Sequence, residues 1–158
     1  MRKSITILAV GVLFLLAGPA WGGIISGLNT DSGYGVHNSL HQWEFLGDAA
    51  SSRALGRVDL DAKFGFDIQG ADLAMLSDGR VVVTHKDSGG AWQASVLNPV
   101  YDGGGLLTDV SIDASINLPV TGSKIAPLPN GGFVVATGGN AVVYQQTGAS
   151  AWSATAGS

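Results

Sequence analysis

Turn-forming residues divide the chain into short apolar segments, and this punctuation most constrains the fold. Between residues 23 and 158 Gly recurs beside Asp, Asn or Ser, and no stretch combines a 3.6-residue hydrophobic period with helix caps. The β-branched run at residues 80–85, for example, begins after Asp78-Gly79 and ends before Ser88-Gly89. Such segments are typical of strands joined by hairpin turns. We therefore expect an all-β fold built of antiparallel sheets.

Alternation of apolar and polar residues places the expected strands. At residues 58–63 the pattern starts with Val58 and Asp59 and predicts a strand with one apolar face, so that Asp59 and Asp61 would face solvent. The best helical candidate, residues 48–55, is barely two turns long. The segments predicted as strands are 23–26, 42–46, 58–63, 73–76, 80–85, 91–97, 109–118, 133–136, 141–145 and 151–155.

The first 22 residues have the pattern of a secretory signal peptide. Arg2 and Lys3 precede an apolar run at residues 5–17, and small residues at 20 and 22 suit cleavage after Gly22, with cleavage after Ala20 as an alternative. An uncleaved membrane anchor is the other interpretation, but a spanning helix needs about 20 apolar residues. We expect residues 1–22 to be removed, a secreted or periplasmic protein, and no membrane span in the remainder.

Composition excludes several classes of function. Removal of residues 1–22 takes Arg2 and Lys3 from the eight bases, so twelve acids face six bases. This acidic balance argues against a nucleic-acid partner. The chain has no cysteine, which rules out disulfides, thiolate metal sites and a cysteine nucleophile. Residues 23–158 are long enough for a single domain with its own core.

An internal repeat is the most informative pattern. Residues 76–84 (LSDGRVVVT) align without gaps on residues 128–136 (LPNGGFVVA), at an offset of 52 residues. Each copy predicts an apolar strand, a two-residue turn with positive φ values, and a β-branched strand. Spacing of this size is typical of propeller blades. The alternative is two unrelated hairpins that share a common kind of turn.

These segments resemble two families of repeats. Residues 125–144 (IAPLPNGGFVVATGGNAVVY) resemble a blade of an NHL-type β-propeller. Residues 72–84 are similar to the L-x-D-G-x-x-V-V-T repeats of large secreted bacterial proteins. The resemblance implies propeller-like blades and a binding or scaffold role. It carries over no catalytic residue, because the matching positions are turn and core residues.

The length conflicts with a closed propeller. Residues 23–158 hold fewer than three units of 52 residues, whereas a propeller has about four blades or more. The expectation is thus a single all-β repeat domain at 23–158, an incomplete propeller. Three explanations stay open: the sequence is truncated, copies of the chain assemble, or the fold is a small β-sandwich.

Histidines and aspartates offer candidate metal ligands. His37 and His41 would share a face if they lay on a helix, but glycines surround them and a third ligand is not nearby, so loop histidines in solvent are the default. Asp59, Asp61 and Asp67 suggest calcium, which prefers oxygen ligands. The EF-hand pattern is absent, and an irregular calcium site stays an alternative to no cofactor.

Nucleophile and phosphate motifs are weak. His85, Asp87 and one of several serines suggest a triad, but the sequence lacks a G-x-S-x-G elbow. Gly122-Ser123-Lys124 lacks the rest of a phosphate loop. The glycines at 103–105 are interpreted as a flexible connection between strands. We assign no catalytic or cofactor-binding residue.

Five large aromatic residues are candidates for either a core or a ligand surface. A core role is favoured, because large aromatics dominate core burial. They are Trp43, Trp92, Tyr101, Tyr144 and Trp152.

The sequence favours an exported, non-catalytic binding or scaffold protein whose partner is a protein or carbohydrate. Self-association is a further expectation. The competing class, implied by the NHL-like resemblance, is a propeller-type hydrolase or lyase with Asp and His residues from several blades converging at a central channel. A cell-surface structural repeat protein is the third alternative.

Overall fold

The computed structural model describes residues 23–29, 38–45, 53–118, 124–137, 140–148 and 151–157. The expected signal peptide at 1–22 therefore lies outside the described residues, as does most of the helical candidate at 48–55. The end of that candidate, residues 53–55, is part of a strand and not of a helix. Among the described residues no helix is both long and apolar enough to span a membrane.

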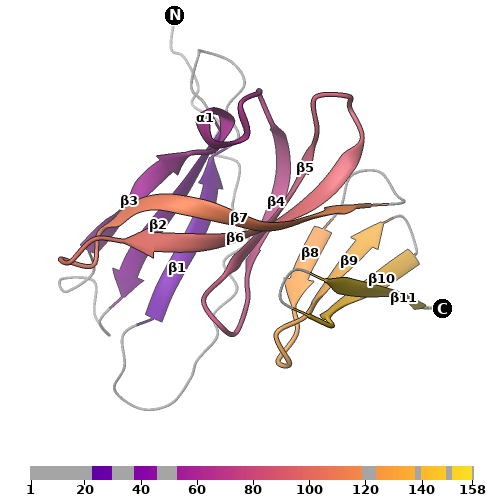
Figure 1. Cartoon of the computed structure of the whole chain (residues 1–158). Helices are drawn as coiled ribbons and strands as arrows, with labels where there is room; N and C mark the ends of the chain where they lie inside the picture. Colours follow the sequence, from indigo (N-terminus) through magenta and orange to yellow (C-terminus); the bar gives the residue numbers. More distant parts are fainter. Residues whose placement is uncertain are drawn as a thin grey trace, which may run out of the picture.

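The described strands form three antiparallel sheets, which confirms the all-β expectation (Figure 1). The first sheet contains β1 (Gly23–Asn29), β2 (Ser39–Phe45) and β3 (Arg53–Asp59). The middle sheet contains β4 (Gln69–Met75), β5 (Val81–Lys86), β6 (Trp92–Tyr101) and β7 (Leu107–Asn117). The third contains β8 (Lys124–Pro127), β9 (Phe133–Thr137), β10 (Asn140–Gln146) and β11 (Trp152–Gly157). In each sheet every strand pairs with its neighbour in the sequence.

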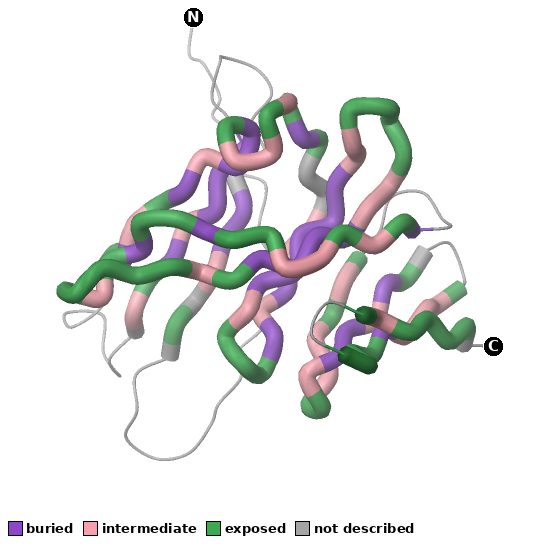
Figure 2. Tube along the Cα trace, in the orientation of Figure 1, coloured by how far each residue is buried: buried purple, intermediate pink, exposed green. Residues whose placement is uncertain are grey.

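The middle sheet lies between the other two, and its first strand β4 contacts both β1 and β8 (Figure 1). Strand β5 is buried from Val81 to His85 because both of its faces are covered (Figure 2). Val81 and Val83 face the first sheet, and Val82 between them faces the third. Two hydrophobic clusters of described residues result, one on each side of the middle sheet. A two-layer sandwich does not describe this arrangement.

Residues 58–63 do not form the predicted strand. Strand β3 ends at Asp59, and a short helix, α1 (Leu60–Phe64), follows. The Asp59 carboxylate caps this helix by accepting a hydrogen bond of 3.0 Å from the Ala62 backbone N–H. Gly65 ends the helix in the left-handed conformation, with φ of 76°. The prediction failed because the caps at Asp59 and Gly65 and the buried hydrogen bonds of Asp61 stabilise one turn of helix. In this turn Leu60 and Asp61 are buried and Ala62 is exposed.

The turns of the two aligned segments share one geometry, which differs from the predicted one. Leu76 and Leu128 each donate their N–H to the carbonyl four residues later and accept from the N–H three residues later. This pattern encloses three residues, as in a type I turn with a glycine bulge, and replaces the two-residue turn expected. Gly79 and Gly131 take the left-handed position with φ of 89° and 81°.

Strands β6 and β7 extend beyond the middle sheet as a hairpin that reaches across the first sheet (Figure 1). Strand β6 was expected to end at residue 97 but continues through Pro99 to Tyr101. Strand β5 pairs with β6 only as far as Leu97. Pro99 lies beyond this point, so its lack of a backbone N–H costs no hydrogen bond to β5. The glycines at 103–105 lie in the turn that connects the two strands, as expected.

Candidate functional site

His85 and Ser95 are the two members of the suggested triad that the fold brings together. The Nε2 atom of His85 lies 2.9 Å from Ser95 Oγ, which lies 3.1 Å from Ser115 Oγ on the next strand. His85 Nδ1 lies 3.0 Å from the Lys86 carbonyl oxygen. A carbonyl only accepts, so Nδ1 donates, and the neutral ring accepts the Ser95 hydroxyl proton at Nε2. This is the tautomer that a histidine general base uses.

The surroundings of this pair do not suit catalysis. His85 and Ser95 are completely buried, and the His85 ring packs against Phe64 with a centroid distance of 4.8 Å. Burial lowers the pKa of His85, opposed in part by the hydrogen bond to Lys86 and by the charge of Asp87. A substrate carbonyl has no path to Ser95 Oγ. The pair satisfies polar groups inside the core.

Asp87, the third member suggested, belongs to the β5–β6 turn. Its Oδ1 atom accepts from the backbone N–H groups of Gly89 and Ala91, each at 2.9 Å, and its Oδ2 accepts from Gln93. The carboxylate therefore fixes the turn through these bonds, and its charge acts on the His85 ring only from a distance. Asp102 holds the β6–β7 turn in the same way, through the N–H groups of Gly104 and Leu106.

The aspartates considered for calcium have separate structural roles. Asp61 was expected on the solvent face of a strand, but it is buried and accepts from the Asn38 and Ile68 backbone N–H groups at 2.8 and 2.9 Å. The Asn38 side chain also joins Asp61 to Asp67, whose Oδ1 accepts from it at 3.1 Å. Asp59 caps α1. Within the described ranges no group of His, Asp or Glu side chains is arranged to hold a metal ion.

His41 lies in strand β2, neither on a helix nor in a solvated loop as considered from the sequence. Its Nε2 atom is 3.0 Å from Ser39 Oγ, and its ring stacks on Trp43 with a centroid distance of 5.7 Å. Burial and the positive charge of Arg57 lower the pKa of His41. His37 lies outside the described residues, as do Gly122 and Ser123, whereas Lys124 begins β8.

The five aromatic residues divide between core and surface. Tyr144 is buried and stacks on Phe133 at 5.0 Å, and Trp92 and Trp152 are partly buried against the same cluster, which confirms the core role for these three. Trp43 and Tyr101 remain 41% and 37% exposed. For these two the ligand-surface alternative describes their position better.

Tyr101 belongs to an exposed apolar end of the β6–β7 hairpin, here called the arm tip and defined as Val100, Tyr101 and Leu106. Val100 and Leu106 are 42% and 44% exposed. The Tyr101 hydroxyl donates to Gln42 Oε1 at 2.8 Å, and the buried Gln42 donates to Ser26 Oγ at 3.0 Å. These bonds fix the hairpin to the first sheet, so the arm tip presents apolar groups on a rigid base.

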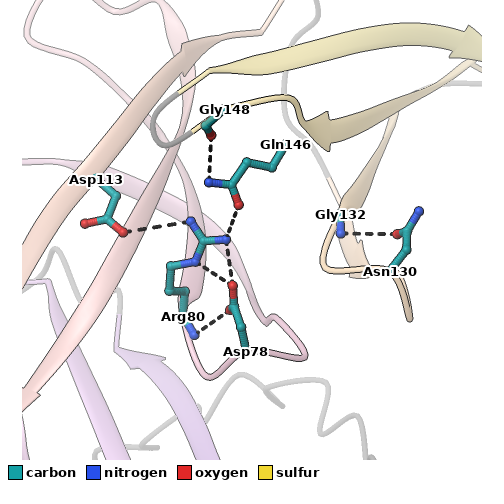
Figure 3. A network of polar contacts seen from close by, with 7 residues as sticks. All are labelled: Asp78, Arg80, Asp113, Asn130, Gly132, Gln146 and Gly148. Carbon is teal, nitrogen blue, oxygen red and sulfur yellow. Dashed lines mark hydrogen bonds and ion pairs between the residues drawn. The ribbon is translucent and has the colours of Figure 1, made fainter.

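Arg80 joins the middle and third sheets through a polar network (Figure 3). Its guanidinium contacts Asp78 Oδ2 at 2.6 Å, Gln146 Oε1 at 2.6 Å and Asp113 Oδ2 at 3.8 Å. It also lies over the Trp152 ring, 5.7 Å from the centroid. The hydrogen bonds to Arg80 lower the pKa of Asp78 against the opposing effect of burial. The charge is thus used to hold two sheets together.

Of the arm tip, the sequence indicated Tyr101 as a candidate surface aromatic but did not indicate Val100 or Leu106. Val100 and Leu106 stand just outside a run of Asp and three glycines. Apolar residues on both sides of such a turn are the signal that was present, because a turn at the end of a long hairpin projects into solvent. No protein-family model, curated protein or solved structure matches the chain significantly.

Proposed function

We propose that this protein is an exported, non-catalytic scaffold that binds a partner protein through the arm tip. The observation that carries this proposal is that the polar candidate residues are buried, whereas the apolar side chains of the arm tip are exposed. His85, Ser95 and Asp61 are buried and hydrogen-bonded within the fold. Val100 and Leu106 are exposed at the end of one hairpin, and Tyr101, which points to the first sheet, is partly exposed beside them. Exposed apolar groups on a rigid base favour recognition over chemistry.

The chemistry of the arm tip favours a protein partner over a carbohydrate. Val100 and Leu106 are aliphatic and offer no hydrogen bonds from their side chains, and the Tyr101 hydroxyl already donates to Gln42. Exposed aliphatic side chains such as Val100 and Leu106 are typical of the apolar centre of a protein interface. A sugar-binding surface would need free polar groups beside the ring.

We further propose that the three sheets are propeller-like blades. Support comes from their topology, because each sheet is a simple meander and β4, the first strand of the middle sheet, contacts β1 and β8, the first strands of the other two. Export is proposed from the sequence of residues 1–22, whose basic start, apolar run and small residues at 20 and 22 have the pattern of a signal peptide. Mass spectrometry of the protein recovered outside the cytoplasm should give a chain that begins at Gly23, or at Trp21 if cleavage follows Ala20.

Site-specific photo-crosslinking tests the binding proposal. A photoreactive residue at Leu106, introduced in the organism that makes the protein, should give a discrete adduct with one partner. The matched control position is Ser88, at the tip of the neighbouring β5–β6 hairpin and also exposed. Val100→Ser should remove the adduct at position 106 without changing the melting temperature. Identical products from positions 106 and 88, or an adduct that survives Val100→Ser, would overturn the proposal.

A further inference from the structure

The outer face of the third sheet has the same surface chemistry as a buried sheet interface. A row of directly paired residues crosses its four strands: Ala126, Val134, Val143 and Thr155. Val134 lies between Phe133 and Val135, which face the middle sheet, so this row points the opposite way. Ala126 and Thr155 are exposed and the two valines are half-buried. We call this row the outer row.

An almost identical row crosses the middle sheet: Ala74, Val82, Val96 and Ala114. Val82 and Val96 are completely buried there, because the third sheet covers them. The covering face is aromatic, with the Phe133 and Tyr144 rings stacked at 5.0 Å and an interplanar angle of 15°. Within this chain, therefore, an Ala-Val-Val row packs against a sheet face that carries a stacked aromatic pair.

The first sheet presents such a face outward. Leu40 and Val58 point to the middle sheet, so His41 and Trp43 at alternating positions point away from it. Their rings stack at 5.7 Å with an interplanar angle of 14°. Trp43 covers Gly27, where a Cβ atom would lie 3.0 Å from the indole, yet it remains 41% exposed. The two outward faces thus match the two sides of the interface formed inside the chain.

We propose that the outer row of one copy binds the His41–Trp43 face of a second copy, head to tail. The order of faces is the same as between the middle and third sheets, with the Ala-Val-Val row on one side and the stacked rings on the other. Such a contact uses two different surfaces, so it is heterologous, and each copy keeps one face of each kind available for a further copy. The inference is independent of the arm tip, which lies on neither face.

Sedimentation velocity of the full chain over a concentration series tests this inference. The wild-type protein should associate in a concentration-dependent manner. Val143→Asp and Trp43→Asp should each raise the dissociation constant about tenfold or more, because a charge would be buried without a partner. The matched control is Ile112→Asp. Ile112 is an apolar residue of β7 that is 38% exposed and belongs to neither proposed contact face. This variant should associate like the wild type.

Mixing the two variants distinguishes head-to-tail contact from contact between identical faces. The Val143→Asp copy keeps its His41–Trp43 face, and the Trp43→Asp copy keeps its outer row. An equimolar mixture should therefore form a heterodimer with the wild-type dissociation constant, although each variant alone associates at least about tenfold more weakly. If either substitution lowers the melting temperature, Ala126→Asp and His41→Asp replace them. A wild-type chain that stays monomeric, association unaffected by both substitutions, or no recovery on mixing would overturn the inference.

Discussion

At the scale of single residues, close backbone approach decides which positions accept no side chain. Gly56 has φ of 140°, and a Cβ atom there would lie 2.6 Å from the Leu107 carbonyl oxygen. This glycine lets β3 lie against β7 where the arm crosses the first sheet. The sequence alone marks Gly56 as one glycine among 24, because the strand it contacts is some fifty positions away along the chain.

Gly56→Ala should lower the free energy of unfolding by about 1–3 kcal/mol, through backbone strain and the clash with Leu107. Gly103→Ala is the control, because a Cβ atom there meets nothing within 4 Å and the backbone is outside the left-handed region. Urea unfolding measures both. Equal effects of the two substitutions would contradict the close approach.

The buried His85 should make stability depend on pH. Its pKa lies below the ordinary 6.5 in the folded protein, mainly through burial. When the pH falls below 6.5 the unfolded chain binds a proton first, so the free energy of unfolding decreases until the pH passes the folded pKa. His41 acts in the same direction. Asp78 has a pKa below 3.8, so it loses its stabilising charge only at much lower pH.

Urea unfolding at several pH values between about 7 and 5 checks this prediction. His85→Gln should flatten most of the decrease, because the amide can still bond to Ser95 and does not titrate. His41→Gln should remove a smaller part, since that ring is only half-buried. A decrease that persists unchanged in His85→Gln would show that other groups cause it.

At the scale of elements, the sequence predicted strands well where Asp and Gly close hairpins. The segments 80–85 and 109–118 correspond closely to β5 and β7. The sequence-based prediction failed where a contact between residues far apart in the sequence determines whether a segment is a strand or a helix. Asp61 is buried because its carboxylate accepts a hydrogen bond from Asn38, 23 positions away along the chain. This long-range bond stabilises α1 together with the local caps of the helix. The same reason explains why the sequence did not predict the whole candidate site. The arm tip is exposed because the β6–β7 hairpin crosses the first sheet, and this crossing depends on long-range contacts.

Arg80→Ala should lower the free energy of unfolding by about 1–3 kcal/mol, since it removes the bonds to Asp78 and Gln146 and the contact with Trp152. Arg80→Lys should recover little of this, because an ammonium group cannot reproduce the planar fork. The control is Lys63→Ala, which breaks the more exposed pair with Asp109 and should cost at most about 0.5 kcal/mol. Full recovery in Arg80→Lys would indicate that only the charge matters.

At the scale of the whole molecule, the two hydrophobic clusters share the middle sheet. Val82 belongs to one cluster and its neighbour Val83 to the other. If β5 loses the packing contacts on one face, it also shifts relative to the residues packed on its other face. The two clusters should therefore stabilise each other. The β-branched run at residues 80–85 predicted a strand, but the sequence could not show that sheets cover both of its faces, or which sheet covers which face.

Val82→Ala and Val83→Ala should therefore each destabilise the protein by about 1–3 kcal/mol and leave a single cooperative transition. Tryptophan fluorescence and far-ultraviolet circular dichroism should report the same midpoint for each variant. Separate midpoints in either variant would mean that the third sheet unfolds independently of the first.

The pairing of every strand with its neighbour in the sequence has a consequence for how the protein reaches its native state. All-β proteins fold slowly when partners are far apart along the chain, because a long loop must close before the contact forms. Here each hairpin closes locally, and a sheet is complete as soon as its last strand is available. A chain that emerges gradually, amino end first, can therefore finish one layer before the next has appeared, and each finished layer offers a template for the one that follows.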